Sequence, residues 1–295
     1  MDNKKIISVK NITKTIKSNN ILKNISFDVY EGDYLALIGP NGAGKTTLMN
    51  CLLGNKFINS GNITINGLKP TNLELKRYVN ALRQENKIPN KLKVKELINF
   101  VQSIYPEHLN IEEIDKILCF DDNQKENLAS KLSGGQRRLL SFVLTLIGKP
   151  KIIFLDEPTA GMDTSTRVRF WEIVNDLKKQ GATIIYSSHY IEEVEHTADR
   201  ILVLHKGELI RDTTPHAMRA EDVEKLFTLP VKYFDLLKNC ENIYSLEVKL
   251  DSFSFLTKDA DNIWKLLERN GCTFKDLEVQ NRTLLDSIFT TTKEN

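Results

Sequence analysis

The sequence predicts an α/β protein with a parallel core sheet, an antiparallel β layer and a helical insert, followed by a small α+β extension. Three observations favour this fold. An apolar run at 34–38 leads into a glycine-rich loop at 39–47 and then into a helical pattern. Two later apolar runs, 151–158 and 183–189, also end in polar side chains, as strands of a parallel sheet do where they meet a ligand. No such motif follows residue 220, so the remaining chain is expected to form a separate unit.

The composition of the 295 residues is that of an ordinary globular protein, with 41% hydrophobic and 27% charged residues. A net charge of +2 argues against bulk electrostatic binding of nucleic acid, although a local basic patch stays possible. The first ten residues lack the apolar core of a signal peptide, and the longest apolar run, 139–147, is too short to span a bilayer. We therefore expect a chain that does not cross a membrane by itself.

The cysteines predict neither a disulfide framework nor a metal site. They lie far apart and form no C-x-x-C pair: Cys51, Cys119, Cys240 and Cys272. This usage is typical of reduced thiols in a cytosolic protein.

The glycine-rich loop fits the phosphate-loop pattern G-x-x-x-x-G-K-[ST]. Its glycines let successive backbone N–H groups point into one hollow, and the N-terminus of the following helix adds partial positive charge. Lys45 is expected to reach the β- and γ-phosphates of a nucleotide, and the Thr46 hydroxyl to bind Mg²⁺. The alternative, a glycine-rich turn that binds nothing, is disfavoured by the flanking strand and helix patterns. The predicted loop residues are Gly39, Pro40, Asn41, Gly42, Ala43, Gly44, Lys45, Thr46 and Thr47.

The segments on either side of this loop predict the antiparallel layer. Short strands are expected at 6–9, 25–29 and 61–67, with a hairpin tip at 18–20. We expect these strands to form a layer in front of the parallel core.

A core strand and a helical insert are predicted next. The strand at 79–85 carries Gln84 near its polar end, and the region 94–128 is mostly helical by period, with a break at Pro106. Taken alone, Gln84 could be any solvated amide at a strand end. The helices separate two halves of the nucleotide-binding domain.

A second glycine-containing cluster follows the insert. Ser133 is a plausible N-cap for a helix at 137–147, and the two glycines after it would let a phosphate approach the backbone. By itself this segment could be only a capping turn. The candidate residues are Ser133, Gly134, Gly135 and Gln136.

Two carboxylates end the apolar run at 151–158. Asp156 is suited to orienting Mg²⁺ through water, and Glu157 is suited to acting as general base on an attacking water. The alternative is an acidic strand-to-loop turn, which explains one carboxylate better than this pair. His189 closes the next strand and could face the γ-phosphate, although a lone histidine at a strand end is more often structural. The helix at 191–198 is expected to present its acidic residues to solvent, and 201–204 and 207–210 to form a hairpin.

Taken in this order, the motifs resemble those of the ATP-binding subunit of an ABC (ATP-binding cassette) transporter. The resemblance covers about residues 4–215 and rests on six matches: the Walker A loop at 39–47, the Q-loop glutamine Gln84, the unchanged signature at 132–136, the Walker B strand and catalytic glutamate at 152–157, the D-loop at 160–163 and the H-loop histidine His189. It implies an ABC-type P-loop ATPase at 1–218, with its helical subdomain at about 88–145.

The resemblance also implies a mechanism. ATP and Mg²⁺ are the expected cofactors; Lys45, Glu157 and His189 are the expected catalytic residues; and Thr46, Gln84 and Asp156 are the expected metal-site residues. Two cassettes sandwich two ATP molecules head to tail, so that Walker A of one faces Ser133–Gln136 of the other. Asp163 of the D-loop is a further expected nucleotide-binding residue. The partner cassette could make a homodimer or a heterodimer. The implied further partner is a polytopic membrane permease at the cytoplasmic face, with no nucleic acid.

One position departs from the family pattern. The family usually carries an aromatic residue before the second strand that stacks on adenine, and alignment from the N-terminal strand places Ile16 there. An aliphatic side chain can still pack on the base, but the stacking is weaker.

The tail at 219–295 is expected to be the small α+β extension. Strands are predicted at 242–250, 253–257 and 274–279 and helices at 260–269 and 282–289. Phe253, Phe255, Trp264 and Phe274 are the predicted core. The closing segment at 284–289 loosely resembles the end of subunits from the drug- and antibiotic-resistance export group. This extension could stabilise a dimer, regulate the cassette or simply pack on it.

The sequence also allows two alternatives to a transporter ATPase. A soluble ABC ATPase that acts on ribosomes or nucleic acid would usually have two cassettes with a basic linker, or a long coiled-coil insertion, and neither is seen here. A degenerate regulatory cassette is disfavoured because Lys45, Asp156, Glu157 and His189 are all present.

Overall fold

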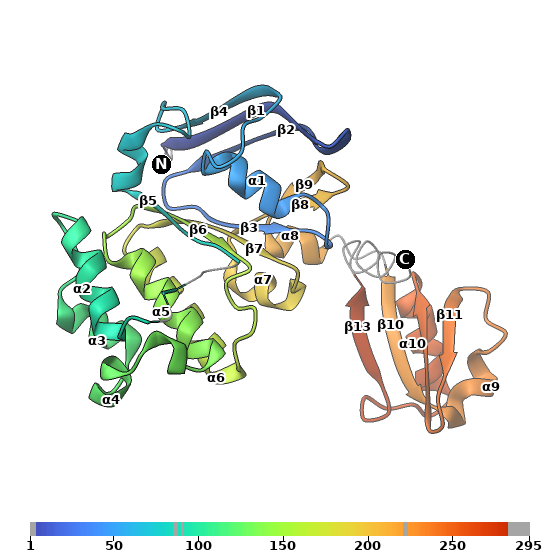
Figure 1. Cartoon of the computed structure of the whole chain (residues 1–295). Helices are drawn as coiled ribbons and strands as arrows, with labels where there is room; N and C mark the ends of the chain where they lie inside the picture. Colours follow the sequence, from blue (N-terminus) through green and yellow to red (C-terminus); the bar gives the residue numbers. More distant parts are fainter. Residues whose placement is uncertain (1–3, 85–87, 90, 221–223, 283–295) are drawn as a thin grey trace. The chain divides into compact units, whose positions relative to one another are not determined.

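The computed structural model divides into two compact units, Met1–Pro215 and His216–Asn295. It describes residues 4–84, 88–89, 91–220 and 224–282. The boundary predicted from the sequence falls after residue 218. Each unit is described by itself (Figure 1).

A six-stranded, largely parallel sheet forms the centre of the first unit, as predicted. Its order is β5-β6-β7-β3-β8-β9, where only the β8–β9 pair is antiparallel. Every residue of the three middle strands is buried, which explains why they appear in the sequence as continuous apolar runs. The strands are β3 (Tyr34–Ile38), β5 (Val79–Leu82), β6 (Ile152–Asp156), β7 (Thr183–Ser188), β8 (Arg200–His205) and β9 (Glu208–Thr213).

The predicted antiparallel layer is present; its first two strands are longer than expected, and its third ends two residues earlier than expected. It has the order β2-β1-β4, with β1 at Lys5–Ile16, β2 at Asn19–Tyr30 and β4 at Ser60–Ile65. The first helix, α1 (Lys45–Leu52), lies between this layer and the central sheet (Figure 1). One apolar cluster joins all three, because Ile7 of β1, Leu48 of α1 and Phe154 of β6 belong to it.

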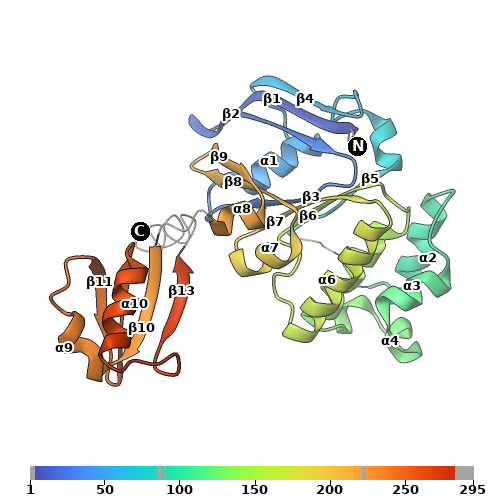
Figure 2. The ribbon, with the colours of Figure 1, turned by 180° about the vertical axis from the view of Figure 1, so that it is seen from behind.

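Helices α5 (Gly134–Leu146), α6 (Thr164–Lys179) and α7 (Ile191–Thr197) cover the opposite face of the central sheet (Figure 1; α6 and α7 are seen from behind in Figure 2). Aromatic rings fill the contact. The rings of Phe142 and Phe170 are 4.5 Å apart between centroids, and those of Trp171 and Tyr186 are 5.1 Å apart. The helix α1 and the helix α5 therefore start on opposite faces of one sheet.

The helical insert contains α2 (Val94–Ile104), α3 (Ile111–Leu118) and α4 (Asp122–Glu126) and is followed by the short 3₁₀ helix Ala129–Lys131. Another short 3₁₀ helix, Leu73–Arg77, precedes β5. The predicted break at Pro106 is present, since α2 ends at Ile104. Asn110 and Asp121 cap the next two helices by accepting hydrogen bonds from backbone N–H groups of their first turns. The predicted strand at 79–85 is shorter, because β5 ends at Leu82.

The boundary between the units falls after the first residue of α8 (Pro215–Ala220). After this helix the second unit forms a four-stranded antiparallel sheet in the order β11-β12-β10-β13. The element order β-α-β-β-α-β is that of a ferredoxin-like fold. The elements are β10 (Glu224–Pro230), a 3₁₀ turn (Val231–Tyr233), α9 (Phe234–Leu237), β11 (Ile243–Val248), β12 (Ser252–Thr257), α10 (Ala260–Arg269) and β13 (Glu278–Arg282). Phe253 and Phe255 lie in its core, as expected, together with Phe227 of a strand that the sequence did not predict.

Two expectations for this unit are wrong. No strand covers 274–279: Asp276 accepts hydrogen bonds from the backbone N–H and the hydroxyl of Thr273, which closes a turn, and β13 starts only at Glu278. Phe274 is 80% exposed instead of buried, although its ring stacks on Trp264 at 4.6 Å. The helix predicted at 282–289 lies outside the described residues, apart from Arg282, which ends β13.

Candidate nucleotide-hydrolysis site

Close backbone packing shapes the phosphate loop. A side chain at Gly39 would place its Cβ 2.1 Å from the carbonyl oxygen of Leu204, so only glycine fits. Gly44 caps α1 with φ of 106°, in the region that favours glycine, and lies against Leu22 of β2. Strand β8 and strand β2 thus hold the two ends of the loop at the N-terminus of α1.

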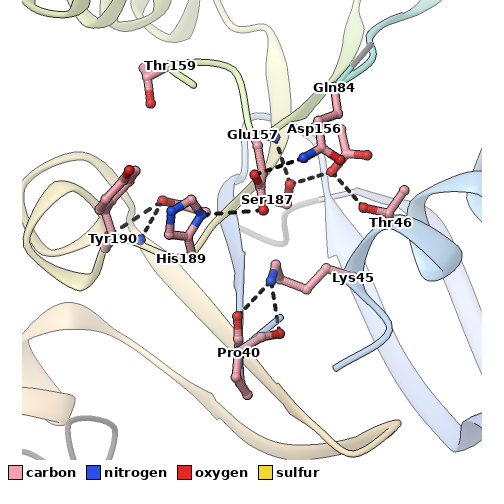
Figure 3. A network of polar contacts seen from close by, with 12 residues as sticks. Pro40, Lys45, Thr46, Gln84, Asp156, Glu157, Thr159, Ser187, His189 and Tyr190 are labelled. Atoms are coloured by element: carbon pink, nitrogen blue, oxygen red, sulfur yellow. Dashed lines mark hydrogen bonds and ion pairs between the residues drawn. The ribbon is translucent and has the colours of Figure 1, made fainter. Parts of the chain in front are cut away.

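Lys45 lies inside this loop and is only 5% exposed. Its ammonium donates hydrogen bonds to the carbonyl oxygens of Gly39 at 2.7 Å and Pro40 at 3.2 Å (Figure 3). Burial lowers the pKa of Lys45, and the nearby carboxylates of Glu157 and Asp156 oppose that shift. The amine of Lys45 is therefore held in the loop, close enough to the two carboxylates for their charges to act on its pKa.

Asp156 is held by two hydroxyl groups at the end of β6. The Ser187 hydroxyl donates to Asp156 Oδ1 at 2.6 Å, and the Thr46 hydroxyl donates to the same oxygen at 3.3 Å (Figure 3). Asp156 is 7% exposed, so the carboxylate keeps this orientation. Ser187 was not predicted from the sequence, because only the sheet register places it opposite Asp156.

These groups fit a magnesium ion that is shared with a nucleotide. A hydroxyl from Thr46, a carboxylate from Asp156 and the amide of Gln84 are all oxygen donors that Mg²⁺ accepts. Within the described residues no group of three or more His, Cys, Asp or Glu could hold a metal alone. Phosphate oxygens and water would have to complete the coordination, as is usual for Mg²⁺ in nucleotide sites.

Glu157 lies at the centre of the site. Its carboxylate accepts a hydrogen bond from Gln84 Nε2 at 3.2 Å and approaches His189 Nδ1 to 3.4 Å (Figure 3). Its backbone N–H donates to the Ser187 hydroxyl at 2.9 Å. The φ angle of Glu157 is 44°, a left-handed conformation that costs a non-glycine residue on the order of 1 kcal/mol. This strained turn directs the carboxylate between the glutamine and the histidine.

A cavity of about 300 Å³ opens beside this cluster. Its walls come from the outer side of α1, from β5 and the residues after it, and from β6: Thr46, Met49, Asn50, Leu53, Ala81, Leu82, Arg83, Gln84, Phe154 and Asp156. Thr46, Gln84 and Asp156, the three expected metal-site residues, thus face an open space.

Arg138 is another residue of the site that the sequence reasoning missed. It is 9% exposed on α5, and burial lowers its pKa to about 10, against the opposing effect of Asp156 and Glu157. Its guanidinium donates to five backbone carbonyl oxygens, those of Arg83, Gln84, Asp156, Glu157 and Pro158. The side chain therefore fastens the Gln84 segment to the Glu157 segment. In the sequence, the signal that could have indicated this role is a basic residue two positions after Gln136, within the helix predicted at 137–147.

The second glycine cluster caps α5. The Ser133 hydroxyl accepts from the backbone N–H of Gln136 at 3.2 Å, and the Gln136 side chain accepts from the backbone N–H of Ser133 at 3.0 Å. This reciprocal pair is a capping box. The helix N-terminus and its glycines stay available to an anion.

Asp163 lies beside this cluster and caps α6. Its carboxylate accepts from the backbone N–H of Thr166 and from the hydroxyls of Ser165 and Thr166, and these bonds lower its pKa. A Cβ at Gly135 would come within 3.3 Å of the Asp163 carboxylate. The chain thus forms two groups of predicted residues: the loop, Gln84, Asp156, Glu157 and His189 in one, and Ser133–Gln136 with Asp163 in the other.

Ile16 is the last residue of β1 and is half-buried. The hairpin turn that follows it, Lys17–Ser18, is exposed and has positive φ angles of 46° and 69°. The contact of Ile16 with adenine stays a prediction.

The comparisons with known proteins agree with this arrangement. The family model "ABC transporter" matches residues 22–160. The chain is also 33% identical over 223 residues to the "Nod factor export ATP-binding protein I" of Rhizobium meliloti (strain 1021), which covers 74% of this chain and 67% of that protein. The chain belongs to the family of ABC transporter ATP-binding proteins. It carries an ABC-type ATPase cassette.

Other relatives and structures fit this membership. The cassette is 36% identical over 218 residues to "Cholesterol transporter ABCA5" of Rattus norvegicus, covering 70% of this chain but only 13% of the relative's length. The solved "Dimeric Structure of MJ0796, a Bacterial ABC Transporter Cassette" matches with a TM-score of 0.64 and 25% identity, over 71% of this chain and 99% of that chain. No helix in the described part of the ABC protein is long and apolar enough to cross a membrane.

Proposed function

We propose that this ABC protein binds and hydrolyses MgATP as one of two cassettes that close head to tail and drive export through a separate polytopic membrane permease. The proposal rests above all on the cluster in which Lys45, Thr46, Gln84, Asp156 and Glu157 meet at one end of the central sheet, as Figure 3 shows. Acidic, amide and ammonium groups converge there on the end of a phosphate loop. This set has the chemistry that phosphoryl transfer to water requires.

Glu157 is the proposed general base. Water attacks the γ-phosphorus while the bond from phosphorus to the bridging oxygen of ADP breaks, and the water proton passes to the Glu157 carboxylate. When ATP binds, the Lys45 ammonium would donate to phosphate oxygens in place of the carbonyl oxygens of Gly39 and Pro40, and would neutralise part of the phosphate charge. His189 approaches Glu157 from the end of β7 and would contact the γ-phosphate from that side. Mg²⁺, held by Thr46, Asp156 and Gln84, would neutralise charge on the β- and γ-phosphates.

A single chain offers only part of each ATP site. Ser133–Gln136 start α5, which covers the face of the central sheet opposite α1 (Figure 1). The phosphate loop of one cassette would thus be completed by the Ser133–Gln136 segment of a second cassette. Either a second copy of this chain or a different cassette could supply it.

Export, the permease and a peripheral location on the cytoplasmic face are supported by the family and by relatives such as the Nod factor exporter subunit. The cargo class would be a drug, a peptide or a similar compound. The soluble alternative, an ABC ATPase acting on ribosomes or nucleic acid, gains no support from these relatives, and the net charge of +2 does not favour a nucleic acid partner.

The test uses Glu157→Gln as bait in gently solubilised cells with MgATP, followed by mass spectrometry of the captured proteins. The matched control is Glu157→Gln with Lys45→Ala, in which ATP-dependent closure should be lost. Capture of a polytopic membrane protein by the first variant, and less of it by the control, is the expected result. Capture of ribosomal or DNA-repair proteins without a membrane partner would overturn the transporter proposal.

A further inference from the structure

Glu193 is an acidic residue on α7, four positions after His189, that the sequence placed on a solvated face. That expectation is wrong, because the Glu193 side chain is half-buried and accepts three hydrogen bonds. One donor is the indole N–H of Trp171 on α6. The others are the hydroxyls of Thr159 and Ser188, each 3.3 Å from Glu193 Oε2. A carboxylate accepts only and offers several lone pairs, so it suits three converging donors better than an amide does.

Thr159 connects Glu193 to the loop after β6. The Thr159 side chain is 3% exposed, and its backbone carbonyl accepts from the N–H of Met162 at 3.1 Å. The turn made in this way leads directly to Asp163, which starts α6. Glu157 lies two residues before Thr159. Glu193 therefore fixes the loop between the proposed base and the D-loop.

Ser188 connects Glu193 to the end of β7. It is 3% exposed, and its hydroxyl oxygen also accepts from the backbone N–H of Tyr190 at 3.0 Å. His189 lies between Ser188 and Tyr190 in the chain, so this hydrogen bond closes the turn that carries it. Its ring nitrogen Nδ1 is 3.4 Å from the Glu157 carboxylate. The turn that carries His189 (Figure 3) is thus fastened to Glu193.

We propose that Glu193 is a positioning residue for ATP hydrolysis. Its carboxylate ties the loop that follows Glu157 to the turn that carries His189, and Trp171 holds the carboxylate from α6. Glu193 does not touch the phosphates; it sets the separation between the base and the histidine. The inference rests on the proposed hydrolysis, so wild-type ATP turnover is measured in the same assay.

The test compares Glu193→Ala with the conservative variant Glu193→Gln and with Glu172→Ala, which removes an exposed carboxylate from α6. Because displacement of catalytic groups by about 1 Å can cost a factor of up to about 100, we expect Glu193→Ala to lower kcat about 10- to 100-fold. The dissociation constant for ATP should stay within about twofold, since no phosphate contact is lost. Glu193→Gln should recover most of kcat, because the amide oxygen can accept from Trp171 while its NH₂ donates to a hydroxyl. Glu172→Ala should equal the wild type.

A double-mutant cycle with Thr159→Val separates positioning from general stability. If Glu193 acts through Thr159, the two substitutions together should lower kcat no further than Glu193→Ala alone. Thr159→Val keeps the shape of the side chain and tests the same contact if Glu193→Ala fails to fold. A kcat within twofold of wild type for folded Glu193→Ala or for Thr159→Val would overturn the proposal, as would multiplicative effects in the cycle. A wild-type chain without ATP turnover, alone or with its partner cassette, would instead contradict the proposed function.

Discussion

Replacing Arg138 by methionine should destabilise the nucleotide-binding unit far more than the same change at its neighbour Arg137. Methionine keeps the aliphatic stem but removes every donor. Arg138 supports five carbonyl oxygens from two separate segments, whereas within the described residues Arg137 donates to the nearby carbonyl oxygens of Ser130 at 3.0 Å and Leu132 at 3.4 Å. The comparison therefore isolates the long-range contacts.

The magnitude follows from the buried acceptors. Two of the five bonds, to Asp156 O at 3.0 Å and to Pro158 O at 2.9 Å, are buried. A buried acceptor left without a partner costs about 1–3 kcal/mol, and removing one partner of a buried charged contact costs about 3–5 kcal/mol. We therefore expect Arg138→Met to lower the free energy of unfolding by about 3–5 kcal/mol. At about 2–4 °C per kcal/mol for a unit of this size, Tm should fall by roughly 6–20 °C.

The assay is thermal unfolding followed by the fluorescence of Trp171, with Trp264→Phe as the common background so that only the first unit reports. Arg138→Lys keeps one cation with three donors and should lie between Arg138→Met and the parent. ATP turnover of Arg138→Met below its Tm should also fall, because the Gln84 and Glu157 segments lose their common anchor. If Arg138→Met and Arg137→Met unfold within about 2 °C of each other, the reasoning about buried carbonyls is refuted.

Four further predictions concern single residues. Glu157→Gln should bind ATP with near-normal affinity and accumulate as an ATP-bound dimer in size-exclusion chromatography, with turnover reduced at least about 100-fold; near-normal turnover would remove Glu157 from the base role. Lys45→Ala should weaken ATP binding at least about tenfold in a fluorescent-nucleotide titration, and an unchanged affinity would contradict the Walker A assignment. Ser133→Arg should leave ATP binding by the monomer intact while abolishing the closed dimer, so a dimer that still forms would exclude the signature from the interface. The hydrogen bonds from Lys232 and from the backbone and hydroxyl of Thr273 lower the pKa of Asp276 from 3.8 to about 2, so its carboxylate stabilises the second unit above pH 4 and loses that effect as the pH falls toward 2. Asp276→Asn should therefore lower Tm at pH 7 but change it little at pH 2, and an equal loss at both pH values would be evidence against a role for the ionised carboxylate.

The central sheet was predictable because each of its buried strands is a continuous apolar run. The phosphate loop, Asp156 and Glu157 follow directly from such runs in the chain. Strand length in the antiparallel layer was not predictable in the same way. Strands β1 and β2 each extend well beyond their apolar cores, because cross-strand pairing continues through polar residues as far as the turn at Lys17.

The contacts of Arg138 and Glu193 could not be predicted from local patterns. Their partners come from segments far away in the chain: the carbonyl of Arg83 lies 55 residues before Arg138, and the hydroxyl of Thr159 lies 34 residues before Glu193. A charged residue on a helix normally indicates a solvent-exposed face. Arg138 and Glu193 depart from this rule because other elements of the fold pack around their side chains. The opposite error was made for Phe274, which was predicted to lie in the core because it is aromatic. It lies in a turn and is exposed.

The phosphate loop depends on a hairpin that is synthesised long after it. Besides the close approach of Gly39 to Leu204, the backbone N–H of Gly207 donates to Ala43 O at 3.1 Å, and the carbonyl of Gly207 accepts from the N–H of Lys23 at 2.8 Å. In a nascent chain on the ribosome these non-local contacts can form only after residue 207 has left the exit tunnel, because they need both segments. Until then the glycine loop lacks the packing of Leu204 on Gly39 and the hydrogen bond from Gly207 to Ala43.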